Sequence, residues 1–132
     1  MTIRTAVLSD LPVLACHDRH ISQSELENLI RLGRVTIAES DGEFVGWLRW
    51  NLFWDNTPFL NMLYLLEPYR GQGYGRAMME HWEAQMANLG YGRLMTSTAA
   101  DEYAQHFYAK LGYTAIGGFT LPGDPYELIF CK

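Results

Sequence analysis

Arg70-Gly71-Gln72-Gly73-Tyr74-Gly75 is the stretch of sequence that decides the fold. The apolar run at 59–66 before it has the length and composition of a buried strand. The segment after it, 75–89, repeats its apolar residues at helical spacing. Glycines between a strand and a helix leave free backbone N–H groups at the helix N-terminus, where the helix dipole also favours an anion. The stretch therefore predicts a loop that binds phosphate groups.

Three glycine-rich patterns compete for this loop. A Walker loop needs Gly-Lys followed by Ser or Thr, but Gly75 is followed by Arg76 and Ala77. The dinucleotide fingerprint needs its third glycine one residue later and an acidic residue about twenty positions on, and segment 91–98 holds no acid. The remaining pattern is Arg-x-x-Gly-x-Gly. Taken alone it also fits a plain glycine-rich turn, so the rest of the chain has to decide.

The bulk composition indicates one folded domain over residues 1–132. The chain is 48% hydrophobic and 19% charged, which is ordinary for a globular protein. A net charge of −5 without a basic run argues against nucleic acid and is compatible with a cationic amine. We expect no membrane segment, no secretory leader and a cytoplasmic location. Cys16 and Cys131 have no metal-ligand spacing, so no metal site is expected.

Local signals predict alternating strands and helices along the whole chain. Ser9-Asp10, Ser22 and Asp101 can each cap a helix, and Asp41-Gly42 is a strong hairpin signal. Expected strands are 2–7, 34–39, 43–50, 59–66, 91–98, 113–119 and 126–131. The expected order is β-α-α-β-β-β-α-β-α-β-β, an α/β fold in which three antiparallel strands precede the glycine loop.

Two motifs on the expected elements resemble those of the GCN5-related N-acetyltransferase (GNAT) family. Arg-x-x-Gly-x-Gly is similar to the family's motif A, and Phe107-Tyr108-Ala109-Lys110-Leu111-Gly112-Tyr113 is similar to its F-Y-x-K-x-G-F/Y segment. The element order also resembles that of the family over essentially the whole chain. The resemblance implies an α+β fold with a central, mixed and mostly antiparallel sheet. It also implies an enzyme that moves acetyl from acetyl-CoA to a primary amine of a small molecule or peptide.

The same resemblance implies which residues bind acetyl-CoA. The backbone of the loop is expected to wrap the pyrophosphate, through Arg70, Gly71, Gln72, Gly73, Tyr74, Gly75 and Arg76. The strand before the loop is expected to separate from its neighbour at a bulge, so that the backbone of Leu63 and Leu65 can pair with pantetheine. Asp101 stands where relatives often have an asparagine that contacts pantetheine. An ionised Asp cannot donate that hydrogen bond, so helix capping is the alternative role.

Three residues are candidates for catalysis. Tyr108 matches the family tyrosine that points at the coenzyme sulfur and can protonate the leaving thiolate, although a core tyrosine would give the same pattern. Asn61, beside the expected acyl site, can hold a water molecule but cannot act as a base. Asp55 can bind a cationic amine or accept its proton, or it can simply form a turn. No cysteine is placed as a covalent relay, so direct transfer in a ternary complex is expected.

Two functions of other classes stay open on the sequence. A CoA-binding sensor or interaction module that has lost catalysis would keep the glycine loop without needing Tyr108. A partner-binding protein could instead use the aromatic-rich hairpin around Trp47, Trp50, Phe53 and Trp54, of which one or two rings could also wall an acceptor pocket. A homodimer is compatible with the resemblance.

Overall fold

A computed structural model describes residues 1–132, and its elements follow the predicted order with two short 3-10 helices added. In chain order they are β1 (Thr2–Thr5), η1 (Leu8–Asp10), α1 (Leu11–His17), α2 (Gln23–Arg31), β2 (Val35–Ser40), β3 (Glu43–Phe53), β4 (Thr57–Leu65), η2 (Glu67–Tyr69), α3 (Tyr74–Asn88), β5 (Met95–Ala99), α4 (Ala104–Lys110), β6 (Thr114–Phe119) and β7 (Glu127–Cys131). No helix combines the length and the apolar stretch that crossing a membrane requires.

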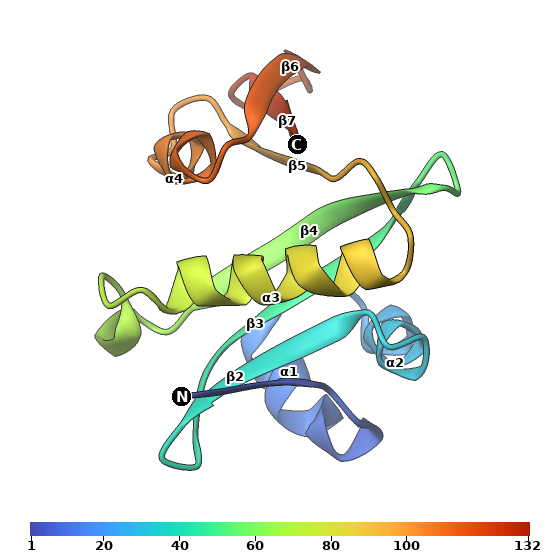
Figure 1. Ribbon diagram of the computed structural model, residues 1–132, viewed down its shortest axis with the longest axis vertical. Coiled ribbons are helices and arrows are strands. Elements are labelled where there is room, and N and C mark those ends of the chain that lie inside the picture. The colour runs from blue at the N-terminus through green and yellow to red at the C-terminus, as the bar shows by residue number, and fades with distance from the viewer.

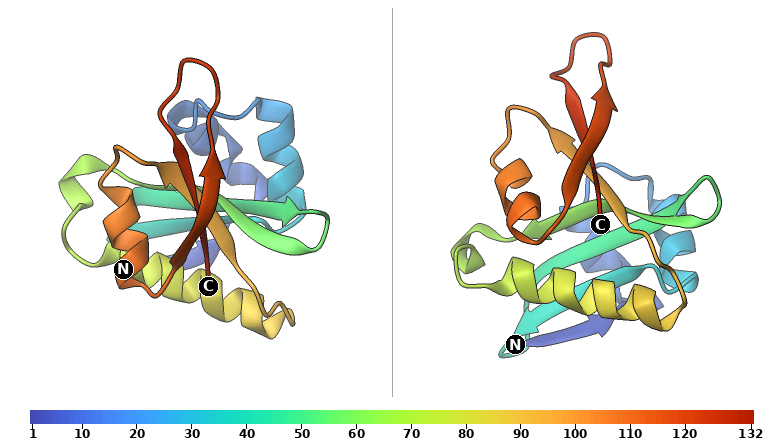
Figure 2. Two further views of the ribbon diagram at one scale, coloured as in Figure 1. Left: turned by 90° about the horizontal axis from the view of Figure 1, so that it is seen from above. Right: turned by 45° about the horizontal axis from the view of Figure 1, so that its top comes forward.

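The seven strands form one sheet in the order β1-β2-β3-β4-β5-β7-β6. All neighbouring strands are antiparallel except β4 and β5, which are parallel. Helix α3 crosses one face of strands β2–β4, whereas α1 and α2 cover the other face (Figures 1 and 2). Strands β5–β7 and α4 stand apart from this body as a second, smaller unit of the same sheet (Figure 2). The expected α+β fold with a mostly antiparallel sheet is confirmed.

Each face of the sheet carries its own hydrophobic core. The predicted stripe of α3 is buried, with Met78, Met79, Trp82 and Met86 packed on Leu48, Trp50 and Leu60. On the other face, α1 and α2 contribute Leu14, Leu26, Leu29 and Ile30, which pack on Val35, Ile37 and Trp47. Side chains alternate between the faces of a strand, so neighbouring β3 residues serve different cores. Burial on both faces fixes the strand register and therefore the position of the segments that β4 and β5 present.

Two of the local signals give the structure that they predict. The Ser22 side chain accepts a hydrogen bond from the Glu25 N–H at 3.2 Å and caps α2. Asp41 and Gly42 both have positive φ, 52° and 78°, and form the two-residue turn between β2 and β3. Short polar residues tolerate these conformations, so the turn is encoded locally.

Three other local predictions are wrong. Asp101 does not cap a helix: a turn closed by Glu102 N–H on Ala99 O at 3.0 Å delays α4, which begins at Ala104. Asp10 stands at the start of α1, but its carboxylate accepts hydrogen bonds from Arg4 and from the Val7 N–H instead of from the helix. The strand expected at 91–98 begins only at Met95, because the Tyr91 N–H closes the end of α3 on Met86 O at 3.0 Å.

Candidate functional site

Strands β4 and β5 part to leave a notch in the middle of the sheet. They pair only at Phe59–Met95 and Leu60–Thr96, although β4 continues to Leu65. A bulge marks the point of separation: Arg49 of β3 pairs with Met62 and Trp50 pairs with Leu60, so Asn61 is the extra residue. The notch therefore begins at an irregularity of β4, the strand in which the family resemblance implied a bulge.

The edge of β4 that faces the notch is free of strand pairing beyond Leu60. The Leu66 N–H donates to Val45 O of β3 at 2.8 Å. Because backbone groups along a strand point alternately to its two edges, Leu63 and Leu65 direct theirs into the notch. This free edge can accept another extended segment, which is the arrangement used in strand addition.

The glycine loop lies at the open end of the notch, between η2 and α3. Gly71 and Gly73 have φ values of 75° and 87°, a conformation that favours glycine. The first helical hydrogen bond of α3 runs from the Ala77 N–H to Gly73 O at 3.1 Å. The N–H groups of residues 74–76 therefore have no partner inside the helix. No atom lies within 4 Å of a Cβ built at Gly71 or Gly73, so the loop faces open space.

The loop's polar side chains contact the protein itself. Arg70 Nε donates to Leu65 O at 2.9 Å, and its guanidinium lies 5.0 Å from the Tyr64 ring centre. Gln72 Nε2 donates to Pro68 O at 3.0 Å, and the Tyr74 hydroxyl donates to Ser40 Oγ at 3.2 Å. Arg76 is exposed and lies 3.6 Å from Glu80. What the loop offers a ligand is chiefly its backbone, with two arginines at the rim.

Gly75 joins the two sequence motifs in space. A Cβ at this position would lie 3.4 Å from the ring of Phe107, in α4, and 3.6 Å from Leu65 Cδ1. The small residue thus lets the first turn of α3 approach α4 and the end of β4. The glycine loop and the Phe107–Tyr113 segment, far apart in the chain, form the two sides of one site.

Tyr108 lies at the closed end of the notch, on the face that carries α3 and α4. It is only 7% exposed and packs in the same core as Leu60, while its phenol lies beside the Thr96 side chain. Thr96 in turn donates to Leu60 O at 3.0 Å. Burial raises the pKa of the Tyr108 phenol; the Thr96 hydrogen bond lowers it by less, and the Glu102 charge raises it further. The phenol is therefore protonated at neutral pH and can donate a proton.

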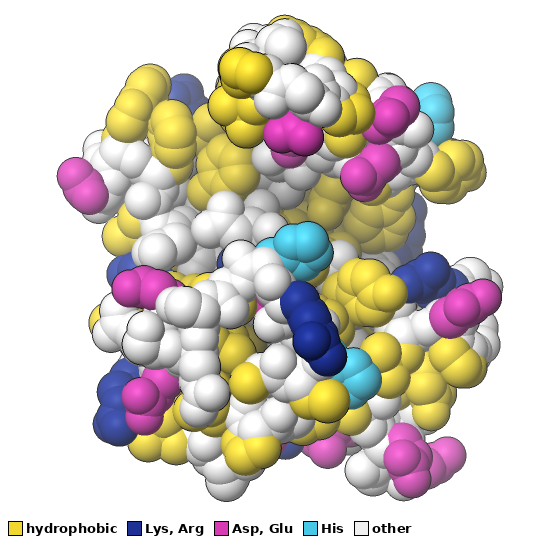
Figure 3. Space-filling view, turned by 180° about the vertical axis from the view of Figure 1, so that it is seen from behind, with side chains coloured by type: hydrophobic (Ala, Val, Ile, Leu, Met, Phe, Trp, Pro, Cys, Tyr) yellow, Lys and Arg dark blue, Asp and Glu magenta, His cyan; other side chains and the backbone are white.

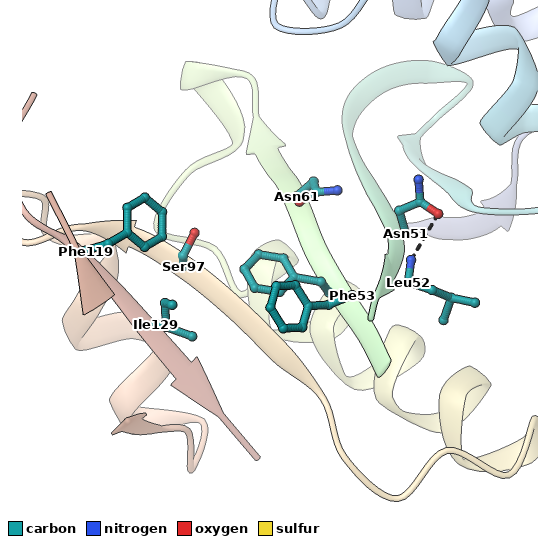
Figure 4. A pocket seen from close by; sticks show the side chains of 8 residues that line it. Asn51, Leu52, Phe53, Asn61, Ser97, Phe119 and Ile129 are labelled. Carbon is teal, nitrogen blue, oxygen red and sulfur yellow. Dashed lines mark hydrogen bonds between the residues drawn. The ribbon is translucent and has the colours of Figure 1, made fainter. Parts of the chain in front are cut away.

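A cavity of about 460 Å³ opens on the opposite face, beside the bulge. Strands β3 to β7 contribute its lining residues, which are Asn51, Leu52, Phe53, Phe59, Asn61, Ser97, Phe119 and Ile129 (Figure 4). Seen from this side, the molecule is hollowed between the β5–β7 unit and the helices α1 and α2, and hydrophobic side chains are visible inside the hollow (Figure 3). None of the lining residues is ionisable at neutral pH.

The polar side chains of the cavity are amides and a hydroxyl. Asn51 Oδ1 accepts hydrogen bonds from Arg34 Nη1 at 2.6 Å and from the Leu52 N–H at 3.0 Å. Its Nδ2 group is therefore the part of the amide that remains to donate. Asn61 projects from β4 and Ser97 from β5 on the two sides of the notch (Figure 4).

The predicted site residues separate into two groups. Tyr108 and Asn61 flank the notch from opposite faces, and Leu63, Leu65 and the loop line its free edge. Asp55, in contrast, lies exposed at the tip of the β3–β4 hairpin, where Trp54 and Asp55 have φ values of 55° and 64°. It does not line the cavity, and Asp101 lies exposed in the turn before α4.

Several residues of the site carry no sequence signal that would have identified them. Phe119, Ile129 and Ser97 meet Phe53 and Phe59 only because β5 pairs with β7 and β7 with β6. The predicted contribution of the aromatic hairpin to a pocket holds for Phe53, whereas Trp47 and Trp50 are core residues. Asp18, in the loop between α1 and α2, is 3% exposed and paired with Arg49. The one sequence signal for this ion pair is Arg49 itself, a charged residue within the apolar stretch of β3 that needs a buried counter-charge.

Comparison with known proteins gives one family. The family model described as "Acetyltransferase (GNAT) family" matches residues 6–113. None of the curated proteins compared with the chain matches its sequence. Ard1 from Thermoplasma volcanium has the same fold, with a TM-score of 0.84 and 16% identity over 99% of this chain and 95% of that one.

Two further solved structures show the same likeness. A ribosomal-protein-alanine N-acetyltransferase from Brucella melitensis has a TM-score of 0.82 and 22% identity, covering 100% of this chain and 99% of its own. The PaiA N-acetyltransferase from Thermoplasma acidophilum, solved with coenzyme A, has a TM-score of 0.78 and 17% identity, covering 97% and 96%. At these identities the structures establish the shared fold.

Proposed function

The chain belongs to the acetyltransferase (GNAT) family, and we propose that it transfers acetyl from acetyl-CoA to a primary amine of a small molecule or peptide. The observation that carries this proposal is the notch between β4 and β5, which has the free N–H groups of the α3 N-terminus at its open end and a buried tyrosine at its closed end. The coenzyme A in one of the similar structures supports the choice of cosubstrate.

Acetyl-CoA fits the notch by three kinds of contact. The free N–H groups at the start of α3 suit the pyrophosphate, because the orphan donors and the helix dipole both favour an anion. Leu63 and the Leu65 N–H offer a free strand edge to the amides of pantetheine. The Leu65 carbonyl already accepts from Arg70, so that contact fixes the loop to the strand.

The thioester would then lie at the closed end, between the two faces of the sheet. The amine nitrogen attacks the acetyl carbon from the cavity side, the C–N bond forms and the C–S bond breaks. Tyr108 donates its proton to the departing thiolate, the amine releases its proton to solvent, and the Tyr108 phenolate takes a proton back from solvent. A raised phenol pKa keeps Tyr108 protonated for this step.

The cavity favours the neutral form of the amine. An apolar, uncharged lining disfavours the ammonium and lowers its pKa on entry. Asn61 is proposed to hold the water that accepts the amine's proton. Asp55, exposed at the hairpin tip beyond Phe53, is proposed to attract the cation before it loses its proton.

Thermal unfolding with and without excess acetyl-CoA tests the proposal. A ligand that binds the folded state raises the midpoint by mass action. Gly73→Val should abolish the rise, because its side chain would block the pyrophosphate site. Gly33→Val is the matched control: Gly33 also has positive φ, 73°, and open surroundings, but it lies after α2.

Each outcome of this test has a meaning. A rise that Gly73→Val removes and Gly33→Val retains supports the cofactor site, and acetyl-CoA-dependent thiol release with an amine supports the enzyme. A rise without thiol release from any amine would favour a catalytically silent CoA-binding module. The absence of a rise at saturating acetyl-CoA would remove the proposal.

A further inference from the structure

The lining of the cavity beside Asn61 defines the chemistry of the acceptor. We infer that the acceptor is a primary amine joined to an uncharged apolar group, which the cavity takes up while the amine faces the notch. The inference rests on the proposed function, since it assigns the second substrate of the same site.

Two apolar walls flank the cavity. Phe53 and Phe59, from the β3–β4 hairpin, form one wall, with their ring centres 5.9 Å apart. Phe119 and Ile129, from β6 and β7, form the other (Figure 4). A volume of about 460 Å³ accommodates an aromatic or branched aliphatic group. Aromatic walls on two sides favour a group that can stack between them.

The position of Asn61 fixes which end of the acceptor lies deepest. Asn61 belongs both to the cavity and to the bulge at which β4 leaves β5. An amine beside Asn61 is therefore at the notch, and the group that it carries extends between the aromatic walls. The cavity thus selects the size and polarity of that group, whereas the notch binds the amine.

The cavity disfavours a charged group on the acceptor, because no lining side chain can pair with a charge. No lysine, arginine, histidine, aspartate or glutamate lines the cavity. A charge placed against this lining would lose part of its water without gaining an ion pair from a lining residue, which is unfavourable. Carboxylates do lie close by: Asp124 and Glu127 line a separate hollow of about 400 Å³ that shares only Phe119 with the cavity. Phe119 thus lies between the uncharged cavity and the acidic hollow.

Matched acceptors test the inference by their kcat/KM in acetyl-CoA-dependent thiol release. 2-Phenylethylamine carries the apolar group, ethylamine lacks it, 4-(2-aminoethyl)benzoic acid adds a carboxylate at its far end, and putrescine carries a second ammonium. We expect 2-phenylethylamine to exceed each of the other three at least tenfold. Equal use of ethylamine, or preference for either charged acceptor, would overturn the inference.

A peptide with an N-terminal phenylalanine and a C-terminal amide presents the same chemistry from a second source. Its comparison with 2-phenylethylamine tells a peptide acceptor from a small-molecule one, and its comparison with the same peptide carrying N-terminal lysine tests the preference for an apolar group. Preference for the phenylalanine peptide over 2-phenylethylamine assigns the peptide source, and the reverse assigns the small molecule. Preference for the lysine peptide would contradict the inference.

Phe119 supplies the variants. It is 45% exposed, so its replacement leaves the core intact. Phe119→Ala should lower kcat/KM for 2-phenylethylamine at least tenfold, and Phe119→Asp should in addition raise kcat/KM for putrescine. Ile116→Ala is the control, because Ile116 lies on the same strand, is 57% exposed and does not line the cavity. Equal effects of Phe119→Ala and Ile116→Ala would count against the assignment.

Failure of the inference is distinguishable from failure of the proposed function. If acetyl-CoA raises the unfolding midpoint and a charged amine is the better acceptor, only the acceptor assignment is wrong. If acetyl-CoA neither raises the midpoint nor releases thiol with any amine, the proposed function is wrong and the inference falls with it.

Discussion

Asp18 and Arg49 form a buried ion pair that fastens the loop between α1 and α2 to the middle of β3. Arg49 Nε donates to Asp18 Oδ2 at 2.7 Å, and the two side chains are 0% and 7% exposed. Trp47 Nε1 donates to the same oxygen at 3.0 Å, and the His20 N–H donates to Oδ1 at 3.2 Å. Arg49 is also the last β3 residue before the register shift opposite Asn61, so the pair anchors β3 beside the bulge of β4.

Removing the Asp18 charge should destabilise the fold strongly. Asp18→Asn leaves the Arg49 guanidinium buried without a counter-charge, so we expect a loss of about 3–5 kcal/mol in the free energy of unfolding. Urea denaturation measures this loss. The control is Glu27→Gln, because Glu27 pairs with Arg31 at 3.2 Å on the exposed side of α2 and should matter by less than about 1 kcal/mol. Equal losses in the two variants would mean that the Asp18 pair contributes no more than a surface pair.

Acid should unfold the protein through the same carboxylate. Burial raises the pKa of Asp18, but the hydrogen bond and charge of Arg49, with the bonds from His20 and Trp47, outweigh it and lower the pKa below its ordinary value. A carboxyl with a lowered folded-state pKa gives stability that is present above its unfolded pKa, about 3.9, and is lost as pH falls through the folded pKa. The urea concentration at the unfolding midpoint should therefore decrease when the pH is lowered below about 4.

Asp10 contributes in the same direction. The Arg4 hydrogen bond lowers its pKa, against burial, and the bond from the Val7 N–H lowers it further. Asp18→Asn should flatten the acid limb of the pH profile, and Asp10→Asn should flatten it in addition. An unchanged acid limb in both variants would show that other carboxylates control acid unfolding.

The phenol of Tyr108 should affect turnover rather than cofactor binding. Tyr108→Phe keeps the packing but removes the proton donor, so kcat should fall about ten- to a thousand-fold with little change in acetyl-CoA affinity. Tyr113→Phe is the control: its hydroxyl is also packed near α4, but it donates to Glu83 Oε2 at 2.7 Å, away from the notch. If Tyr108→Phe and Tyr113→Phe had the same kcat, Tyr108 would be a core residue only.

The sequence predicted those parts of the site that a short segment encodes by itself. Glycines between an expected strand and an expected helix locate the loop, and a short motif that resembles the family's singles out Tyr108; their roles in binding and catalysis stay predictions. The acceptor cavity could not be predicted, because Ser97, Phe119 and Ile129 come together through the β5-β7-β6 strand order. The buried ion pair of Asp18 could not be predicted for the same reason, since its partner lies thirty-one residues away on a buried strand. Asp101 failed as a cap because a turn at 99–102 delays α4.

Arg70 should tune acetyl-CoA affinity without being essential for it. Arg70→Met removes the donor to Leu65 O and the cation over Tyr64, so the loop loses its anchor to the strand and a rim charge. We expect the Kd for acetyl-CoA to rise about tenfold. A charge-assisted hydrogen bond contributes about 1.5–3 kcal/mol, and only part of the free energy lost with it affects binding, through the position of the loop. Binding should persist, since the N–H groups at the start of α3 remain.

Arg76→Met is the matched control for this experiment. Arg76 is 59% exposed and its nearest partner, Glu80, lies 3.6 Å away. Its loss should change the Kd by threefold or less at physiological salt, because exposed charges are screened there. The Kd of the Arg70→Met protein should also depend less on salt than that of the unmodified chain. If titration calorimetry gave the two variants the same Kd, the contact between Arg70 and Leu65 would have no part in preparing the loop for the pyrophosphate.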